Sequence, residues 1–212
     1  PFVIAVGVKL LPLIILPLLW VKLGWRKGLV FVSLTGIGIF ILFLPYLNAS
    51  VIYNFSNSLN LYFQTFEFNA SIYYVFRWIG FQWSGYNMID TIGVINALIT
   101  FGLVLYISFR KQTNWEQTFL LVVLIFGIYL SFASIVHPWY ISTLLLFSIF
   151  TKYRFALVWS GLIYLSYFPY RDDTYTENMW LVFLEYAIVI SYLAYEVWQS
   201  KKTTRLTTSH TP

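Results

Sequence analysis

The sequence predicts an all-α membrane protein, a polytopic transmembrane helix bundle of about seven spans with an external interfacial helical segment. Three observations support this prediction. Hydrophobic residues make up 59% of the chain and charged residues 10%, whereas soluble domains have roughly 45–50% and about 25%. The hydrophobic residues fall in runs close to the length of about 20 residues that a spanning helix needs. The basic residues collect between these runs, which is the pattern of membrane topology.

The apolar runs end at basic residues, prolines or polar loops. The first run is interrupted by Lys9, Pro12 and Pro17, and the fifth and sixth runs are short. We expect residues 1–200 to form a single bundle and residues 201–212 to form a cytoplasmic tail. The spans are expected near residues 2–20, 29–47, 92–109, 119–136, 139–151, 155–168 and 179–198.

The charges predict the orientation of the bundle. Ten of the thirteen basic residues fall at alternate junctions on one side, and five of the eight acids fall on the other side. Loops rich in lysine and arginine remain in the cytoplasm, so we expect the basic side and the C-terminus to be cytoplasmic. Seven crossings that start outside and finish inside agree with this assignment.

Residues 48–90 are then external. This segment is rich in aromatic residues and is too long for a structureless loop, so we predict one or two helices at the outer interface. Its side chains repeat at helical spacing on two faces. These faces are Phe63, Glu67, Ala70, Tyr74 and Trp78, and Asn69, Tyr73 and Arg77.

Several function classes are excluded by the sequence. It contains no cysteine, and therefore no disulfide, thiolate metal site or cysteine nucleophile. It has no Walker motif, dinucleotide fingerprint or zinc-ligand spacing. The basic residues do not form a nucleic-acid-binding face. We expect membrane lipid as a partner, no nucleic acid and no cofactor, and the sequence leaves metal dependence open.

Ionisable side chains inside a membrane are costly and are therefore candidate functional residues. Lys9 is a candidate to bind a phosphate, with snorkelling or pairing with an acid as the alternative. Glu185 lies about two turns into the last span, and Asn178 lies seven residues earlier on the same face. Pairing of Glu185 with Lys9 or Arg77 and contact with a substrate both remain open.

A second set of candidates lies on the external side. His137 and Tyr140, in the stretch His137-Pro138-Trp139-Tyr140, are near enough in sequence to face one cavity. A lone histidine is more often structural than catalytic, and both roles remain open here. Glu67 beside aromatic residues suits a sugar, and Arg77 suits a phosphate; an exposed ion pair is the alternative. The adjacent acids Asp172 and Asp173 resemble a metal or acid site, but adjacent acids in a polar turn are mostly solvated, and we expect that here.

Several stretches resemble a known family. They are Lys9-Leu10-Leu11-Pro12, Phe66-Glu67-Phe68-Asn69-Ala70-Ser71-Ile72-Tyr73-Tyr74, His137-Pro138-Trp139-Tyr140, Trp159-Ser160 and Leu165-Ser166-Tyr167. They resemble the C-terminal half of bacterial polyprenol-phosphate-mannose-dependent mannosyltransferases of the GT-C superfamily, the Bacteroidetes-type members most closely. The resemblance spans nearly all of this chain but only around half of a full-length enzyme.

This resemblance implies a substrate and a reaction. The donor is a polyprenyl-phosphate-linked sugar, which is transferred at the periplasmic face of the bacterial inner membrane to a hydroxyl of a glycan or lipid acceptor. The general base is a carboxylate in the first external loop, which the resemblance places upstream of Pro1. We therefore expect this chain alone to be inactive.

The resemblance also implies residue roles. His137 matches a histidine of the family's outer cavity and is the catalytic candidate, while Lys9 and Arg77 are expected to bind the donor phosphate. The expected substrate-cavity residues are Glu67, Asn69, Tyr73, Tyr140 and Glu185. Two other functions remain open: a lipid or polysaccharide transporter or flippase, and a non-catalytic partner in envelope assembly.

Overall fold

The computed structural model describes residues 1–64, 66–171, 173 and 175–208, with the side chains of residues 59–64 and 203–208 outside the description. Asp172, one of the two adjacent candidate acids, is outside the described residues. The described part of the chain is helical, which confirms the all-α prediction. Its only β-type pairing is a single bridge between Phe68 and Ile135.

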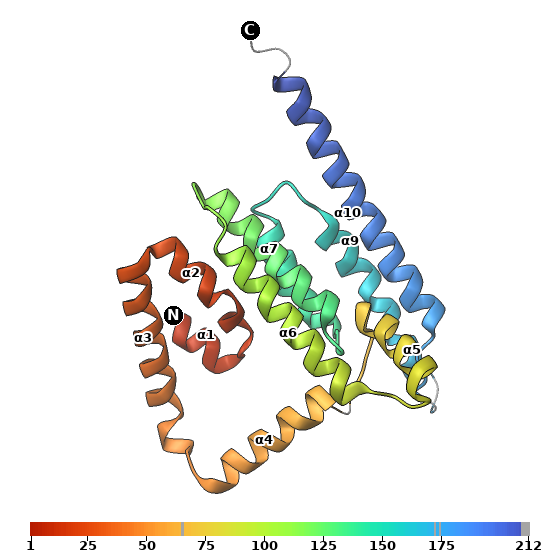
Figure 1. The fold of residues 1–212 in the computed structure, drawn as a ribbon, viewed down its shortest axis with the longest axis horizontal. Coiled ribbons are helices and arrows are strands. Elements are labelled where there is room, and N and C mark those ends of the chain that lie inside the picture. Colours follow the sequence, from red (N-terminus) through yellow and green to blue (C-terminus); the bar gives the residue numbers. More distant parts are fainter. Residues whose placement is uncertain (65, 172, 174, 209–212) are drawn as a thin grey trace.

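The helices follow one another through short turns (Figure 1). In chain order they are α1 (Phe2–Val8), η1 (Leu11–Ile15), α2 (Leu16–Leu23), α3 (Trp25–Phe43), η2 (Leu44–Tyr46), α4 (Ala49–Gln64), α5 (Ile72–Ser84), α6 (Ile89–Ser108), α7 (Trp115–Phe132), η3 (Pro138–Tyr140), α8 (Ile141–Ser148), α9 (Phe155–Leu162), η4 (Ile163–Arg171) and α10 (Met179–Thr208).

The structure corrects the number of spans. Four of the described helices are long and apolar enough to cross a membrane, rather than seven. They are Trp25–Tyr46, Ile89–Ser108, Trp115–Phe132 and Met179–Lys202. The protein is therefore a multi-pass membrane protein with fewer full-length spanning helices than the apolar runs suggest.

The first expected span, residues 2–20, is broken. Helix α1 ends after seven residues, and Lys9 then adopts an extended backbone with φ −155° and ψ 130°. Pro12 and Pro17 stand in the first turns of η1 and α2, where the missing N–H of proline is tolerated. Both α1 and α2 pack against α3, so this run folds back on itself.

The fifth and sixth expected spans, residues 139–151 and 155–168, are divided in the same way. Helix α8 has eight residues and is therefore about 12 Å long, against a hydrocarbon core of about 30 Å. Helix α9 also has eight residues and continues as the 3₁₀ helix η4, which contains Pro169. Apolar composition predicted these runs, but α8 is too short to cross the core, and the sixth run is not one continuous α-helix.

The α2–α3 corner depends on two glycines. Gly24 has a φ of +80°, a conformation that glycine adopts without steric cost. A Cβ atom on Gly28 would lie 2.1 Å from Cδ1 of Trp20. A larger residue at position 28 would therefore force α2 and α3 apart.

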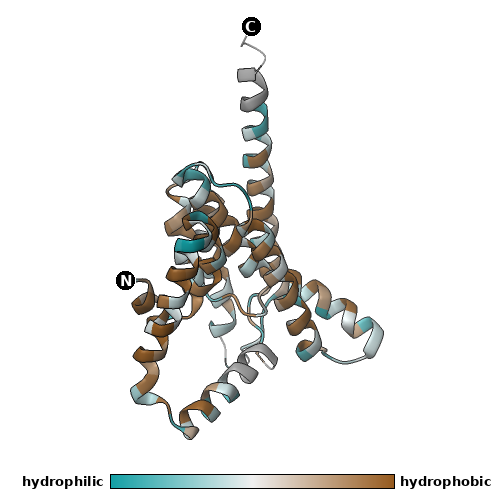
Figure 2. Ribbon diagram, turned by 60° about the vertical axis from the view of Figure 1, so that its left-hand side comes forward, coloured by the Kyte–Doolittle hydropathy of each residue, from teal (hydrophilic) through white to brown (hydrophobic). Residues whose placement is uncertain are grey.

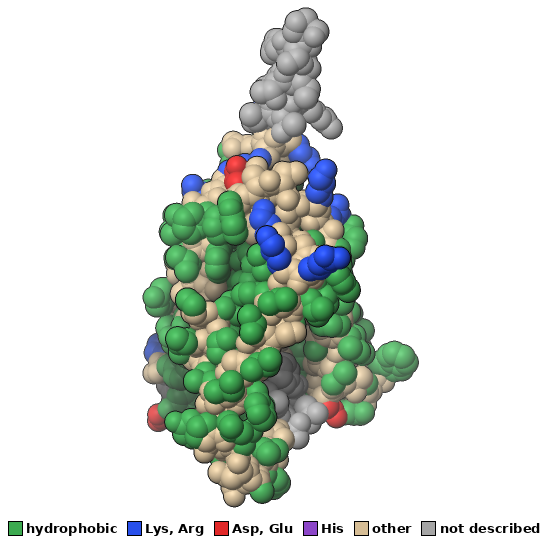
Figure 3. All heavy atoms as spheres, turned by 90° about the vertical axis from the view of Figure 1, so that its left-hand side faces the viewer, with side chains coloured by type: hydrophobic (Ala, Val, Ile, Leu, Met, Phe, Trp, Pro, Cys, Tyr) green, Lys and Arg blue, Asp and Glu red, His purple; other side chains and the backbone are tan. Residues whose placement is uncertain are grey.

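The charges separate along the bundle as predicted. The α2–α3 corner, the turns at 109–114 and 149–154 and the C-terminal end of α10 lie at the upper end in Figure 1, which we call the basic end. Figure 3 shows Lys and Arg side chains gathered there and hydrophobic side chains covering the middle of the same face. Figure 2 shows hydrophobic residues along the packed helices and hydrophilic residues at the upper turns.

Residues 48–90 contain the helices α4 and α5, as predicted, and both lie at the lower end in Figure 1. Helix α5 ends at Gly85, whose φ of +77° is a common helix stop. Helix α10 begins at Asn178, whose Oδ1 accepts from the backbone N–H of Trp180 at 3.0 Å. This capping contact accounts for Asn178, which the sequence analysis grouped with Glu185.

Candidate functional site

An extended segment, residues 66–70, joins α4 to α5, and we call it the connector. The backbone N–H of Phe68 donates to the carbonyl of Ser134 at 3.0 Å, and the carbonyl of Phe68 accepts from Val136 at 2.8 Å. Successive side chains of an extended chain point to opposite sides. Phe66 and Phe68 contact the His137 ring, whereas Glu67 contacts Arg77. Asn69 contacts Glu185.

The conformation of the connector shows that the two predicted helical faces are wrong. Glu67, Asn69 and Ala70 do not share helical faces with residues of α5, because residues 66–70 are not helical. The backbone hydrogen bonds of Phe68 go to residues 134 and 136 instead, and Asn69 has a left-handed φ of 46°. Asparagine adopts this conformation more readily than most residues. Only Tyr73, Tyr74, Arg77 and Trp78 lie in α5.

On one side of the connector lies the His137 cluster, which contains Phe66, Phe68, His137, Trp139 and Tyr140 together with Lys9. The His137 ring stacks on Trp139 with centroids 4.3 Å apart and packs against Phe68 at 5.0 Å. Tyr140 meets the His137 ring edge-on at 5.5 Å. The Nζ atom of Lys9 lies 4.2 Å from the centre of the Tyr140 ring. The structure thus brings Lys9, His137 and Tyr140 together.

The electrostatics of this cluster favour a neutral imidazole. Burial lowers the pKa of His137 from its ordinary value, and the positive charge of Lys9 lowers that pKa further. The imidazole is therefore mostly neutral at pH 7. Within the described part of the chain, the only ion pair joins Arg77 to Glu67, so no described carboxylate neutralises the Lys9 ammonium.

On the other side of the connector lies the Arg77 cluster, which contains Glu67, Tyr73, Tyr74, Arg77 and Asn87. A guanidinium nitrogen of Arg77 lies 2.7 Å from Oε1 of Glu67, and the Asn87 amide donates to the same oxygen at 3.2 Å. The guanidinium also lies 4.4 Å from the centre of the Tyr74 ring. Tyr73 is fully buried, and its hydroxyl donates to Asn87 at 3.5 Å. The ion pair between Glu67 and Arg77, which was the alternative to binding a sugar and a phosphate, is thus present.

Glu177 joins the Arg77 cluster to the connector and was not among the residues predicted from sequence. Its carboxylate accepts from the Tyr74 hydroxyl and from the backbone N–H of Asn69 at 2.6 Å. Burial raises the pKa of the Glu177 carboxyl, although these two hydrogen bonds act in the opposite direction. Only its acidic character near the start of α10 could have drawn attention to it, because its partners are far away in sequence.

Glu185 forms the buried centre of a further network. It is fully buried, and its carboxylate accepts from the Asn69 amide at 3.2 Å on each oxygen and from the Trp159 indole at 2.8 Å. The Tyr186 hydroxyl donates to the Asn69 carbonyl at 2.7 Å. Glu185 pairs with neither Lys9 nor Arg77, so the pairing alternative is wrong. We call these residues, with Glu177, the Asn69 network: Asn69, Trp159, Glu177, Glu185 and Tyr186.

The structure therefore divides the predicted site residues between separate surroundings. Lys9 contacts Tyr140, whereas Arg77 contacts Glu67, Tyr74 and Met179. No described contact partner is common to the two cations, which the sequence analysis assigned to one phosphate. Asn69 and Glu185 are fully buried and hold the connector in place. Their substrate-contact role stays a prediction.

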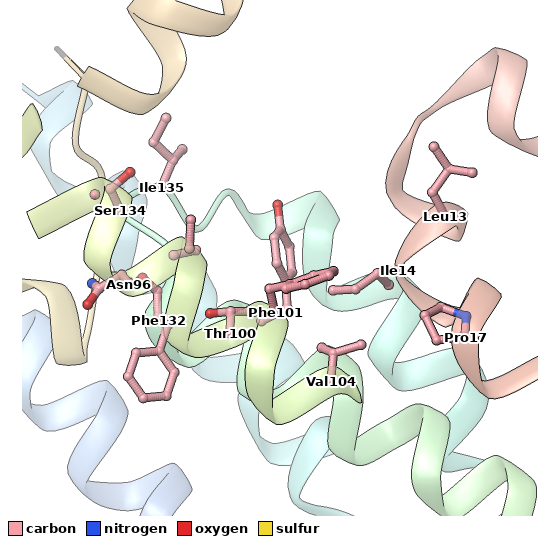
Figure 4. Close-up of a pocket in the computed structure, with 14 residues that line it drawn as sticks. Leu13, Ile14, Pro17, Asn96, Thr100, Phe101, Val104, Phe132, Ser134 and Ile135 are labelled. Carbon is pink, nitrogen blue, oxygen red and sulfur yellow. Dashed lines mark hydrogen bonds between the residues drawn. The ribbon is translucent and has the colours of Figure 1, made fainter. Parts of the chain in front are cut away.

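Two apolar cavities lie next to these clusters. The α6–α7 cavity, of about 290 Å³, is formed by α6, α7 and the η1–α2 segment. Figure 4 shows Ser134 and Ile135 at one end of it and Leu13 and Pro17 at the other. The α5–α10 groove, of about 640 Å³, is formed by α5, α7, α9 and α10. Its lining residues with a hydroxyl or indole N–H are Ser71, Tyr74, Trp78, Ser131, Trp159 and Tyr186.

Tyr74 of the Arg77 cluster lines the α5–α10 groove, whereas the lining of the α6–α7 cavity includes no residue of the His137 cluster. The lining of the α6–α7 cavity includes Leu13, four residues after Lys9, and Ile135, two residues before His137. The lining of the α5–α10 groove includes Tyr74 and Met179, both of which contact Arg77. Within the described residues, no group of three or more histidine or acidic side chains is placed to hold a metal ion.

The fold and its long apolar helices define an all-α, multi-pass membrane protein. Comparison with known proteins adds no relative, since no protein-family model, no curated protein and no solved structure matches the chain.

Proposed function

We propose that this chain belongs to a membrane glycosyltransferase that moves a mannose-type sugar from polyprenyl phosphate to a hydroxyl of a glycan or lipid acceptor. One observation carries the proposal: two polar clusters lie on opposite sides of the connector at one end of the bundle, and Tyr74 of one cluster lines an apolar groove. A transfer between two membrane-bound substrates needs two such places side by side. The family resemblance of the connector and of the His137 stretch adds support.

The chemistry of the two clusters suits the two substrates. A departing polyprenyl phosphate carries negative charge, which a preorganised cation stabilises best where water is excluded. Lys9 and Arg77 are the cations of the two clusters. The aromatic rings around His137 offer flat apolar surfaces with a neutral imidazole that donates or accepts a hydrogen bond. Small-molecule sites commonly combine such apolar walls with a few placed polar groups.

Three of the described carboxylates at this end are already held by other residues. Glu67 pairs with Arg77, Glu177 accepts from Tyr74, and Glu185 accepts from Asn69 and Trp159. A general base must be free to reach the proton that it abstracts. We therefore assign the general base to none of these three residues.

The proposed orientation places the basic end in the cytoplasm, on the positive-inside rule. The absence of cysteine allows single-cysteine variants without background labelling. Tyr86→Cys lies in the exposed α5–α6 turn, and Thr113→Cys lies in the exposed α6–α7 turn. We expect a membrane-impermeant maleimide to label Tyr86→Cys in spheroplasts, and Thr113→Cys only after permeabilisation. The reverse pattern would place the connector in the cytoplasm and contradict the proposal.

Replacing His137 tests the reaction itself. In membranes that contain the full-length protein and a fluorescent polyprenyl-phosphate mannose, we expect His137→Ala to reduce sugar transfer by about 100-fold. The variant removes the imidazole around which the aromatic rings pack. The measurement is transfer of labelled sugar to acceptor at matched protein levels.

The control is Ser191→Ala, an exposed position on α10, which should transfer sugar at the wild-type rate. Wild-type transfer by His137→Ala would remove His137 from the reaction. Movement of the lipid across the bilayer with no sugar transfer by the wild-type protein would instead support a transporter.

A further inference from the structure

The 3₁₀ helix η4 has three distinct faces, because this helix type repeats every three residues. The buried face consists of Ile163, Ser166 and Pro169. The next face consists of Tyr164, Tyr167 and Tyr170, which are 65%, 41% and 57% exposed. In an α-helix, residues three apart are turned by about 60° from one another, so the 3₁₀ conformation is what places the three tyrosines on one exposed face.

The tyrosine rings are evenly spaced along this face. The ring centroids of Tyr164 and Tyr167 are 6.0 Å apart, and those of Tyr167 and Tyr170 are 5.9 Å apart. Three residues of a 3₁₀ helix rise by about 6 Å, so the rings follow the helix axis. The ring of Tyr175 lies a further 5.8 Å from that of Tyr170. We call these four residues the tyrosine row: Tyr164, Tyr167, Tyr170 and Tyr175.

The fourth ring of the row belongs to a residue with a strained backbone. Tyr175 has a φ of 49°, which residues other than glycine adopt infrequently. Such conformations cost free energy and cluster at active sites and ligand clamps. Tyr175 is nevertheless 63% exposed. Its strain is therefore associated with a ring on the surface rather than with a side chain packed into the core.

The tyrosine row is continuous with the His137 cluster. The ring of Phe68, in the connector, lies 6.4 Å from that of Tyr170 and 5.0 Å from that of His137. A series of ring contacts therefore extends from His137 to Tyr164. The helix rises by about 12 Å between Tyr164 and Tyr170. An elongated ligand along the row would thus have one end beside the His137 cluster.

The composition of the row favours a sugar chain over a hydrocarbon chain. The membrane helix α3 exposes aliphatic side chains, such as Leu34, Ile37 and Ile41, whereas every residue of the row has a hydroxyl. A tyrosine ring can stack on the C–H face of a sugar ring while its hydroxyl exchanges hydrogen bonds with the sugar hydroxyls. Helix η4 is outside the four long apolar helices, and residues 171–178 include no alanine, valine, leucine or isoleucine.

We propose that the tyrosine row binds a mannose-containing glycan chain and holds it with one end at the His137 cluster. The spacing of the rings is comparable to the length of one hexose unit, so successive sugars of a chain can contact successive rings. The proposal rests on the proposed function, and it selects a glycan from the two acceptor classes named there.

The test is the binding of mannohexaose to the purified protein in detergent micelles, measured by isothermal titration calorimetry. We expect mannohexaose to bind at least about tenfold more tightly than mannose, because contacts along the row are made within one molecule. Tyr164→Leu/Tyr167→Leu should weaken mannohexaose binding at least about tenfold, since it removes two aromatic faces but keeps apolar side chains of similar reach.

Two further variants serve as controls. Tyr164→Phe/Tyr167→Phe keeps both rings and should lose less affinity than the leucine variant. Tyr53→Leu makes the same change at an exposed position of α4 and should bind mannohexaose like the wild type. All three variants replace exposed side chains, so their unfolding temperatures should stay near that of the wild type.

Two results would overturn the proposal. One is wild-type affinity for mannohexaose in Tyr164→Leu/Tyr167→Leu, which would leave the tyrosines as an anchor at the membrane interface, where tyrosine is enriched. The other is a wild-type protein that binds mannohexaose no more tightly than mannose.

The outcome is separable from that of the proposed function. Binding of mannohexaose through the tyrosine row, without sugar transfer in the membrane assay, would defeat the enzyme proposal and leave the glycan surface intact. Sugar transfer by a wild-type protein that does not bind mannohexaose would defeat the glycan surface and leave the enzyme proposal intact.

Discussion

Glu185→Ala is expected to destabilise the folded protein by about 3–5 kcal/mol, because it leaves two buried donors without an acceptor, each costing roughly 1–3 kcal/mol, together with a cavity. The donors are the Asn69 amide and the Trp159 indole N–H. For a chain of this size, such a loss corresponds to a fall in unfolding temperature of about 6–20 °C. Thermal unfolding of the purified protein in detergent measures it.

Glu185→Gln is the matched variant. It keeps the volume of the side chain and an acceptor for Trp159, and its amide can donate to Oδ1 of Asn69, which is buried without a partner. We expect it to lose less than half as much stability as Glu185→Ala. A Glu185→Ala variant that unfolds at the wild-type temperature would show that the Asn69 network does not stabilise the connector.

Lys9→Met is expected to reduce sugar transfer by about 100- to 1,000-fold, the usual loss when one preorganised charge-stabilising group is removed. The physical reason is that the departing phosphate then meets no cation on its side of the connector. Transfer from labelled polyprenyl-phosphate mannose in membranes measures the effect, and the unfolding temperature should stay near that of the wild type, because Lys9 is exposed and makes no ion pair with a described residue.

Two variants complete this experiment. Lys111→Met makes the same chemical change at an exposed position of the basic end and should transfer sugar at the wild-type rate. The double variant Arg77→Met/Glu67→Gln removes both charges of the ion pair together and should lose less transfer than Lys9→Met. If the double variant lost more transfer than Lys9→Met while remaining folded, Arg77 would be the principal phosphate ligand.

The spanning helices could be predicted from sequence where their cause is local. Residues 29–47, 92–109, 119–136 and 179–198 are long runs with few charges, and each overlaps one of the four long apolar helices, although the run at 119–136 continues four residues beyond the end of α7. Pro12 and Pro17 indicated that a helix over residues 2–20 would be interrupted. Its return path, however, depends on packing of α1 and α2 against α3, which composition does not encode.

The candidate site was predictable only in part. Polar residues are easily recognised in a sequence this hydrophobic, and Lys9, Tyr140 and His137 do lie together in the structure. The connector was misassigned because Glu67 and Asn69 happen to stand at helical spacing from Tyr73 and Tyr74. Its extended form depends on hydrogen bonds to Ser134 and Val136, from a segment far along the chain.

The sequence by itself determined that the chain is an all-α membrane protein with its basic residues at one end, because hydrophobicity and charge act through the composition of each local segment. Tertiary structure alone decided which polar groups meet. It separated Arg77 from Lys9, gave Arg77 a carboxylate partner, and built the Asn69 network from residues distant in sequence. These outcomes depend on the pairing of charges and hydrogen-bonding groups in three dimensions, and a buried polar group is stable only where packing supplies it a partner.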